Sequence, residues 1–358
     1  MRRRGRENQL GSTMSAPIRE EAGMTGPADF GALADPYRPE LLAYCYRMLG
    51  SVDDAEDQVQ EILLRAWRSY AEFEGRSSLR TWLYRIATNS CLRALETRSR
   101  RPLPSGLAGP AADPGAPLAA DRAEVSWLQP FPDALVTGTP ADPATVVAAR
   151  AGLRLALSAA LQYLPPSQRA VLILRDVLGW HAVEAAELLG VSTAAANSTL
   201  QRARAQLAQA APEQDDLREP SDPADRNLLD RYAAAFESAD VSALTALLRA
   251  DATLEMPPQP YWFSGREQVS AFFRSTVLVA PREFRLVPAP ANGQPAFAAY
   301  LRADAGPFRA HGIQVLSTRG GLVTRIVSFN DGRLLAAFGL PDELPAASGP
   351  GAVRPGRP

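Results

Sequence analysis

One stretch decides how the middle of the chain folds: residues 164–209 read LPPSQRAVLILRDVLGWHAVEAAELLGVSTAAANSTLQRARAQLAQ. The apolar spacing predicts a helix from about Ser167 to Val177 and a shorter helix that stops at Gly190. Ser192 is a suitable N-cap for a third helix. A glycine followed by an apolar residue fits the turn of a tight helix–helix crossing. The stretch therefore predicts a helix-turn-helix.

The third helix of this motif has an apolar face and a polar face. Leu200, Ala203 and Leu207 are expected to face the core. The opposite face is small and polar, so the helix could enter a DNA major groove, where amides bond adenine and guanidiniums hold phosphate or guanine. The candidate DNA-binding residues are Asn197, Ser198, Gln201, Arg202 and Arg204. The alternative is a helical hairpin that packs on another protein.

A second two-faced helix is predicted over residues 77–101, SSLRTWLYRIATNSCLRALETRSRR. One face can enter a core through Leu79, Leu83, Ile86, Ala87, Ser90 and Ala94. A second stripe carries Trp82, Arg85, Asn89 and Arg93. Guanidiniums meet phosphates, aromatic rings stack on bases and an amide can read a base edge, so a nucleic acid would explain this stripe. The alternative is a solvated basic face with Trp82 half-buried against a neighbour.

Charge is distributed unevenly around this helix. Residues 76–102 hold seven arginines against one glutamate, whereas residues 52–74 hold seven acids against two arginines. The net charge of the whole chain, −1, hides this asymmetry. A basic helix beside an acidic one indicates a polyanion as the partner of the first and a basic protein surface as the partner of the second.

The bulk composition fits a multidomain protein without a membrane span, metal centre or cofactor. A chain of 358 residues is expected to form two or three domains. It has no apolar run of membrane-spanning length, and its basic start lacks the apolar segment of a secretory signal. Cys45 and Cys91 fall in apolar helical contexts and are expected to be reduced thiols. Two histidines without a Cys/His cluster argue against zinc, and no phosphate-binding loop is found.

Composition also divides the chain into segments. In order, we expect a disordered extension (1–35), a helical domain (36–105), a Pro/Gly-rich linker (106–146), the helix-turn-helix domain (147–212), a second linker (213–225), an α+β domain (226–341) and a disordered tail (342–358). Within the first linker, Trp127, Leu128 and Phe131 are costly to leave in water, so this part is expected to dock on a surface.

Both helical blocks resemble one family. Residues 43–95, AYCYRMLGSVDDAEDQVQEILLRAWRSYAEFEGRSSLRTWLYRIATNSCLRAL, resemble region 2 of sigma-70-family RNA polymerase sigma factors of the extracytoplasmic-function (ECF) type. Residues 164–207 resemble region 4, and the two motifs occur in the family's order and spacing. The resemblance implies a cytoplasmic protein that binds the clamp and flap of core RNA polymerase. It also implies that the first block binds and melts the −10 promoter element and that the second binds the −35 element.

The resemblance also implies roles for individual residues. The polymerase-binding residues would be Asp54, Asp57, Gln60, Glu61, Arg65 and Trp67. Asn89 matches the position that holds a flipped −10 base, and the strand-separating segment is matched by Trp82, Tyr84 and Arg85. The base- and phosphate-contacting positions of region 4 are matched by Asn197, Ser198, Gln201 and Arg202. Many family members carry arginine where Asn197 stands, so the −35 sequence cannot be carried over.

Residues 226–341 are predicted to form an α+β domain in which helices precede strands. Turns are expected at Asn292–Gly293 and Gly320–Gly321, and a short helix is expected at the end. This order is similar to the SnoaL-like cone of the nuclear-transport-factor-two superfamily, which is fused to one subset of these sigma factors. The expected fold class is therefore two all-α domains followed by an α+β SnoaL-like cone, with the cone as a regulatory module.

Such cones often enclose a pocket, and some are enzymes. The candidate lining residues are Glu255, Trp262, Phe263, Phe272, Tyr300, His311 and Asn330. An enzyme of the ketosteroid-isomerase kind would use Glu255 or Asp331 as a general base, together with His311. No carboxylate–histidine spacing is diagnostic here, so a non-catalytic module with a small-molecule or protein ligand is preferred. A plain helix-turn-helix repressor, acting without polymerase, is the third hypothesis.

Overall fold

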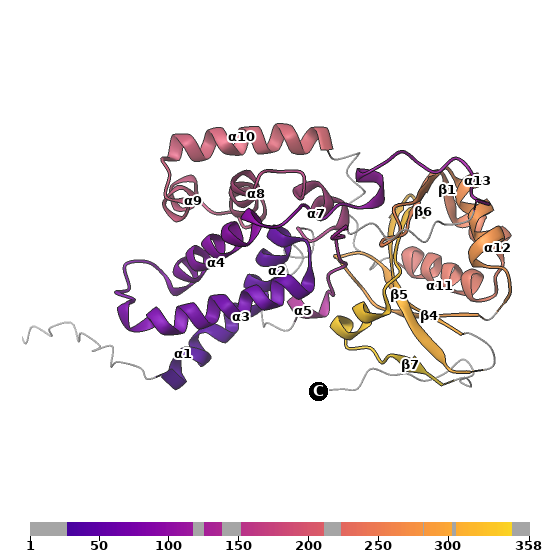
Figure 1. Cartoon of the computed structure of the whole chain (residues 1–358), viewed down its shortest axis with the longest axis horizontal. Coiled ribbons are helices and arrows are strands. Elements are labelled where there is room, and N and C mark those ends of the chain that lie inside the picture. The colour runs from indigo at the N-terminus through magenta and orange to yellow at the C-terminus, as the bar shows by residue number, and fades with distance from the viewer. Residues whose placement is uncertain are drawn as a thin grey trace, which may run out of the picture.

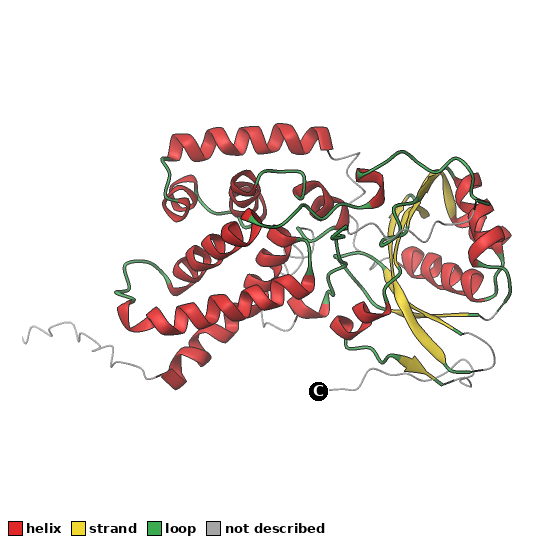
Figure 2. Cartoon of the chain, in the orientation of Figure 1, coloured by secondary structure: helices red, strands yellow, loops and turns green. Residues whose placement is uncertain are grey.

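The computed structural model describes residues 27–116, 125–137, 152–210, 223–281, 283–302 and 306–345. Two helical domains, α1–α4 and α7–α10, lie one above the other, and an α+β domain lies beside both (Figure 1). Its sheet stands between the helical domains and the helices α11–α13 (Figure 2). The predicted fold class is confirmed.

The first helical domain is a bundle of helices with capped ends. Its elements are α1 (Pro27–Ala34), η1 (Asp35–Tyr37), α2 (Arg38–Leu49), α3 (Val52–Ser69), η2 (Tyr70–Glu72) and α4 (Leu79–Glu96). Gly50 ends α2 in the left-handed conformation, with φ 74°. The hydroxyls of Ser51 and Ser78 accept the amides of Asp54 and Thr81, which fixes where α3 and α4 begin.

Two boundaries of this domain differ from the prediction. The segment expected to be disordered contains helix α1, which packs on the domain because Phe30 is buried with its ring 5.0 Å from that of Tyr70. Residues 1–26 lie outside the described residues. Helix α4 ends at Glu96 instead of continuing to residue 101. Beyond it, Arg98 and Arg101 pair with Asp54 on α3, which draws the chain off the helical path.

The second helical domain confirms the predicted helix-turn-helix. Its elements are α7 (Leu155–Leu161), α8 (Pro166–Leu172), the π-helical η4 (Ile173–Val177), α9 (Ala182–Leu189) and α10 (Thr193–Ala210). Helix α9 ends at Gly190, with φ 67°, as the turn requires. The Ser192 hydroxyl accepts the Ala195 amide at 3.2 Å and caps α10.

The α+β domain has the predicted order of elements. Its helices are α11 (Pro223–Glu237), α12 (Val241–Leu247), α13 (Arg266–Phe272), the π-helical η5 (Phe273–Val277) and the 3-10 helix η6 (Gly332–Phe338). Its strands are β1 (Leu248–Glu255), β2 (Trp262–Ser264), β3 (Phe284–Pro288), β4 (Ala296–Leu301), β5 (Phe308–Arg319), β6 (Leu322–Phe329) and β7 (Glu343–Leu344). Both predicted turns have positive φ at each of their central residues. Strand β7 pairs with β5, so part of the tail expected to be disordered belongs to the sheet.

The described strands form one mixed sheet that is covered on both faces. Its order is β2-β1-β6-β5-β4-β3, with β1 parallel to β6 and β7 paired to β5. One face packs an aromatic core with α11–α13, including Tyr232, Phe236 and Phe272. The other, outer face carries mostly small and aliphatic side chains together with Tyr300, Phe308 and Phe329, and it meets Leu128 and Leu155 from other parts of the chain. The sheet therefore joins the cone to the helical domains.

The first linker docks as predicted. It contains η3 (Pro104–Gly106) and α5 (Ala134–Thr137); residues 117–124 and 138–151 lie outside the described residues. Leu128 is 1% exposed, Phe131 is 0% exposed with its ring 4.8 Å from that of Tyr46, and Trp127 is half-buried. A segment rich in proline and glycine thus fills part of the seam between domains.

Within the described part of the chain, no helix has both the length and the apolar character needed to cross a bilayer. The same residues hold no cluster of His, Cys, Asp and Glu side chains suited to a metal ion. Cys45 and Cys91 are buried free thiols with their Sγ atoms 3.7 Å apart.

Candidate nucleic-acid and polymerase interfaces

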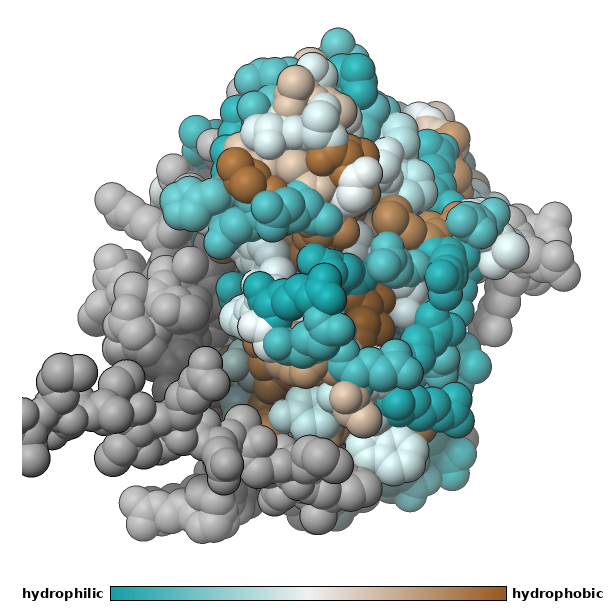
Figure 3. Space-filling view, turned by 90° about the vertical axis from the view of Figure 1, so that its left-hand side faces the viewer, coloured by the Kyte–Doolittle hydropathy of each residue, from teal (hydrophilic) through white to brown (hydrophobic). Residues whose placement is uncertain are grey.

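The polar stripe of α4 lies on the surface. Arg85, Asn89 and Arg93 are exposed, whereas Leu83 and Ala87 on the other side are fully buried. The end of the molecule formed by the helical domains is mostly hydrophilic, with apolar side chains gathered in patches (Figure 3). Two guanidiniums and an amide therefore share one accessible stripe, as a nucleic-acid surface requires.

Trp82 is only half-exposed and belongs to an aromatic cluster. Its ring centroid lies 4.9 Å from that of Phe73 and 6.3 Å from that of Tyr70. This is the arrangement of the alternative interpretation, in which the indole packs against a neighbour. The cluster holds the segment before α4 against the domain.

Tyr84 lies in the core, contrary to the prediction that it faces DNA. It is 0% exposed, and its ring lies 5.2 Å from the rings of both Tyr44 and Trp180. Its hydroxyl donates to Glu40 at 3.3 Å, and burial raises the pKa of the phenol. Each helical residue is rotated by about 100° from the last, so the neighbour of an exposed residue can point inward.

Helix α10 presents most of its predicted residues to solvent. Asn197, Ser198, Gln201 and Arg202 are all exposed. Arg204 is exposed but its guanidinium donates to both carboxylate oxygens of Asp176, at 2.8 and 2.7 Å. Arg204 therefore braces α10 against η4, and the other four side chains form the accessible polar face.

The acidic helix α3 carries an exposed stripe. Asp57 and Gln60 are exposed, and Leu64 and Trp67 are 40% and 45% exposed. Their spacing of three, four and three places them on one face. Beside them, Glu61 pairs with Arg65 at 2.6 Å. Acidic groups next to exposed apolar side chains suit a basic protein partner. The sequence analysis did not predict Leu64 as part of this surface, because a single exposed leucine leaves no signal in the sequence.

Asp54, one of the predicted polymerase-binding residues, is engaged with other residues of the chain in this arrangement. Its side chain is 18% exposed and accepts from Arg98 at 2.7 Å and from Arg101 at 2.6 Å. Arg101 also donates to the Trp127 carbonyl at 3.1 Å. Asp54 thus ties α3 to the chain after α4 and, through Arg101, to the linker.

The two helical domains pack directly on each other beside the stripe of α4. Trp180, which precedes α9, is 6% exposed and contacts Tyr84. The Arg80 guanidinium lies 5.1 Å from the Tyr84 ring centroid and 5.6 Å from that of Trp180, and it pairs with Glu40 at 2.8 Å. Arg80, Glu40 and Trp180 were missed, because the sequence does not reveal which residues meet between domains.

Two buried cations also join these domains. Arg47 on α2 is 1% exposed and donates to the Gly152 carbonyl at 2.9 Å. Arg169 on α8 is 3% exposed and donates to the Met48 carbonyl and, at 3.0 Å, to Gln162. Burial lowers the pKa of each guanidinium to about 10, so both stay charged at neutral pH. Separating the domains would change the surroundings of both charges.

Asn292, in the turn before β4, joins the cone to the rest of the molecule. Its Nδ2 donates to the Tyr46 hydroxyl at 2.9 Å and to the Leu153 carbonyl at 2.7 Å. Its Oδ1 accepts the Phe131 amide at 2.9 Å, and its own amide donates to the Phe131 carbonyl at 2.8 Å. Next to it, Gln294 accepts the Leu155 amide at 2.9 Å. One turn thus contacts the first helical domain, the linker and the second helical domain.

The predicted pocket residues of the cone do not converge on one site. Glu255 and Trp262 line a cavity of about 380 Å³, and Asn330 lines a separate one of about 630 Å³. Phe263 and Phe272 stack in the aromatic core with centroids 4.6 Å apart. The Tyr300 hydroxyl donates to the Pro341 carbonyl at 2.9 Å.

The two candidate general bases are engaged with other groups. Glu255 is 1% exposed, accepts the Ser105 amide at 2.9 Å and pairs with Arg325. Asp331 caps η6 and accepts from Arg333 at 2.6 Å. Burial lowers the pKa of His311, whose ring contacts Phe284. These residues hold the fold and the linker together instead of surrounding one substrate.

Three families match the chain in succession. Residues 33–101 match Sigma-70 region 2, residues 154–207 match Sigma-70 region 4, and residues 229–326 match the SnoaL-like domain. The first two ranges are the two helical domains, and the third lies within the α+β domain.

The chain is similar in sequence to curated sigma factors. The chain is 52% identical to the ECF RNA polymerase sigma factor SigG of Mycobacterium tuberculosis over 320 residues, 88% of this chain and 85% of that protein. It is 33% identical to SigJ of the same organism over 218 residues, 60% and 61% of the two chains. The crystal structure of SigJ shares the fold, with a TM-score of 0.56 and 24% identity over 87% of this chain and 99% of that one. The chain therefore belongs to the sigma-70 family of RNA polymerase sigma factors, within its ECF group.

Proposed function

We propose that the exposed faces of α4 and α10 are the two promoter-reading surfaces of this sigma factor. Arg85, Asn89 and Arg93 would hold the −10 strand, with Asn89 on a flipped base. The −35 duplex would be read by Asn197, Ser198, Gln201 and Arg202. The observation that carries the proposal is that both faces are polar and exposed while the opposite faces are buried. Tyr84 and Arg204 are left out, because the Tyr84 hydroxyl is buried against Glu40 and the Arg204 guanidinium is paired with Asp176.

We infer that α3 supplies the contact with the polymerase clamp. Asp57, Gln60, Leu64 and Trp67 form its exposed stripe, and the Glu61–Arg65 pair lies beside it. Asp54 would contribute indirectly, by fixing the chain after α4. We also place the protein in the cytoplasm, where polymerase and promoters are found.

The described arrangement is, in this proposal, a closed form. The two promoter elements lie roughly 25 base pairs apart, or about 85 Å along a duplex with a rise of about 3.4 Å per base pair. Residues at the start of α4 touch Trp180 directly, and an 18-residue helix such as α4 is only about 27 Å long. The second helical domain must therefore leave the first for both elements to be read together.

We propose that the cone regulates this change and is not catalytic. Its hairpin turn at Asn292 holds both helical domains and the linker in the closed form. Glu255, the best-placed buried carboxylate, is bound to the Ser105 amide and to Arg325, which argues against a role as general base.

Run-off transcription with core polymerase tests the proposed readers. Asn89→Ala should impair promoter opening while −35 binding is retained, because a flipped base loses its partner. Permanganate footprinting should show reduced melting, and a duplex −35 fragment should bind as the parent does. Normal melting in the Asn89 variant would contradict the −10 assignment. Glu96→Ala, at the exposed end of the same helix, is the matched control.

A further inference from the structure

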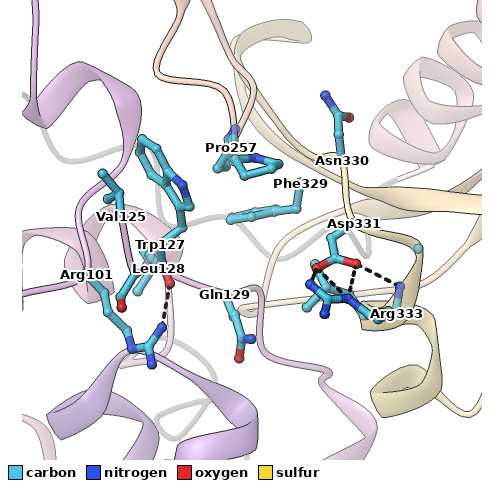
Figure 4. A pocket seen from close by; sticks show the side chains of 14 residues that line it. Arg101, Val125, Trp127, Leu128, Gln129, Pro257, Phe329, Asn330, Asp331 and Arg333 are labelled. Carbon is cyan, nitrogen blue, oxygen red and sulfur yellow. Dashed lines mark hydrogen bonds and ion pairs between the residues drawn. The ribbon is translucent and has the colours of Figure 1, made fainter. Parts of the chain in front are cut away.

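The cavity of about 630 Å³ lies where three parts of the molecule meet (Figure 4). Its walls come from Arg101 after α4, from linker residues 125–129, and from cone residues 257–258 and 329–334. Phe329 belongs to the outer face of the sheet, so the cavity lies away from the aromatic core under α11–α13. Its volume is in the range of small-molecule sites, about 300–1,000 Å³.

Flat apolar groups form one part of the cavity. Trp127 from the linker faces Pro257 and Phe329 from the cone (Figure 4). The indole Nε1 of Trp127 is buried and has no hydrogen-bond partner among the described residues. Buried polar groups in native proteins are nearly always paired, so this donor is available to an acceptor on an occupant if the indole turns toward the cavity. A planar molecule would fit between these surfaces.

The charged groups in the lining are two arginines and one acid. Arg101 and Arg333 line the cavity together with a single acid, Asp331. The side chain of Arg333 is 91% exposed, although its guanidinium pairs with Asp331 at 2.6 Å. The outward edge of that guanidinium can still donate, because a guanidinium has five N–H groups. An anionic group on the occupant would be favoured at this end.

We propose that this cavity binds a flat aromatic molecule that carries an anionic group, with its ring beside Trp127, Pro257 and Phe329 and its anion toward Arg333. The three walls come together only when the linker and cone are docked on the first helical domain. The ligand therefore binds the closed form and shifts the population toward it. The regulatory consequence rests on the proposed function of the cone, whereas the binding itself does not.

The fluorescent anion 8-anilinonaphthalene-1-sulfonate is a suitable probe, because it carries a flat naphthalene ring system and an anionic sulfonate. Titration of the full chain, without polymerase or DNA, should show saturable binding of one molecule per chain. Energy transfer from tryptophan to the probe should fall more in Trp127→Phe than in Trp67→Phe, since Trp67 lies on α3 and does not line the cavity. The chain has five tryptophans, so equal losses in the two variants would contradict the site.

Two further variants, each with a control, test the walls. Ser126→Phe should weaken probe binding at least tenfold by filling the cavity, whereas Ser275→Phe, at an exposed position on the cone, should not. Arg333→Gln should weaken binding of the anionic probe severalfold but leave binding of the neutral analogue N-phenyl-1-naphthylamine unchanged. Arg309→Gln, at another exposed ion pair of the cone, is its control.

Absence of saturable binding overturns the proposal, and so does binding that neither Ser126→Phe nor Arg333→Gln weakens. Circular dichroism and unfolding of each variant separate a lost site from a lost fold. Because the titration needs no promoter, its failure leaves the assignment of the DNA-reading helices intact.

Discussion

Asn292 shows how one side chain can hold separate domains together. It has φ 58°, a left-handed conformation that asparagine tolerates better than most residues, and it is fully buried. Its amide group makes three side-chain hydrogen bonds, to Tyr46, Leu153 and Phe131. All of these partners would need water or new partners if the cone left its position.

Replacing Asn292 with glycine should loosen this junction. Glycine keeps the positive φ without strain but removes the three side-chain hydrogen bonds, so the free energy of unfolding should fall by about 1–3 kcal/mol. Urea unfolding measures this loss. Asn292→Asp, which keeps the size but cannot donate to Tyr46 and Leu153, should lose at least as much. A loss below about 0.5 kcal/mol in both variants would show that the turn does not hold the domains together.

At the scale of elements, α3, α4 and α10 each combine a buried face with a face that has another use. On α3 the free face is acidic and partly apolar, and on α4 and α10 it is basic or amide-rich. Burial of the first face fixes the orientation of the second, so each surface is presented at little further cost in conformational entropy.

Charge reversal on α3 should weaken assembly with core polymerase. Asp57→Arg combined with Glu61→Arg places two positive charges where a basic partner is expected, and like charges at an interface are strongly unfavourable. Co-purification with core polymerase should fall at least tenfold. Asp230→Arg combined with Glu267→Arg, at exposed positions on α11 and α13, is the matched control. If both double variants co-purify equally well with polymerase, the assignment of α3 to the polymerase interface is contradicted.

Truncation of one amide on α10 should weaken −35 recognition. If Gln201 makes a bidentate base contact, Gln201→Ala should cost about 1–3 kcal/mol of binding to the −35 duplex, or roughly 5- to 150-fold. Gln209→Ala, exposed near the end of the same helix, should cost nothing measurable. Electrophoretic mobility shift at fixed salt distinguishes the two, and equal affinities would place the base contacts elsewhere.

At the scale of the whole molecule, three domains and the linker share one seam. Buried Arg47 and Arg169, the Trp180–Tyr84 contact and the Asn292 turn all lie on it. The arginines and the Asn292 turn make polar contacts, which can exchange for water more readily than aliphatic contacts can, whereas the Trp180–Tyr84 contact is aromatic.

The sequence predicts individual elements well, because their signals are local. Periodicity and caps such as Ser51 and Ser192 place the helices, and the Asn-Gly pair at residue 292 places a hairpin turn. Tyr84 was misplaced because alignment to a linear motif ignores the rotation between adjacent helical residues. The partners of Asn292 lie 139 to 246 residues away, so no local pattern could identify them.

The central claim, that the closed form must open for promoter recognition, can be tested by one distance. Glu96 on α4 and Glu187 on α9 are exposed, so cysteines introduced at these two positions can carry spin labels. Native Cys45 and Cys91 are buried and should not react with the label. Double electron–electron resonance on the free protein should give one short distance. With core polymerase and promoter DNA, the distance should lengthen by about 20 Å or more, because the two elements lie about 85 Å apart along the duplex. An unchanged distance in a complex that still makes transcripts would contradict the account.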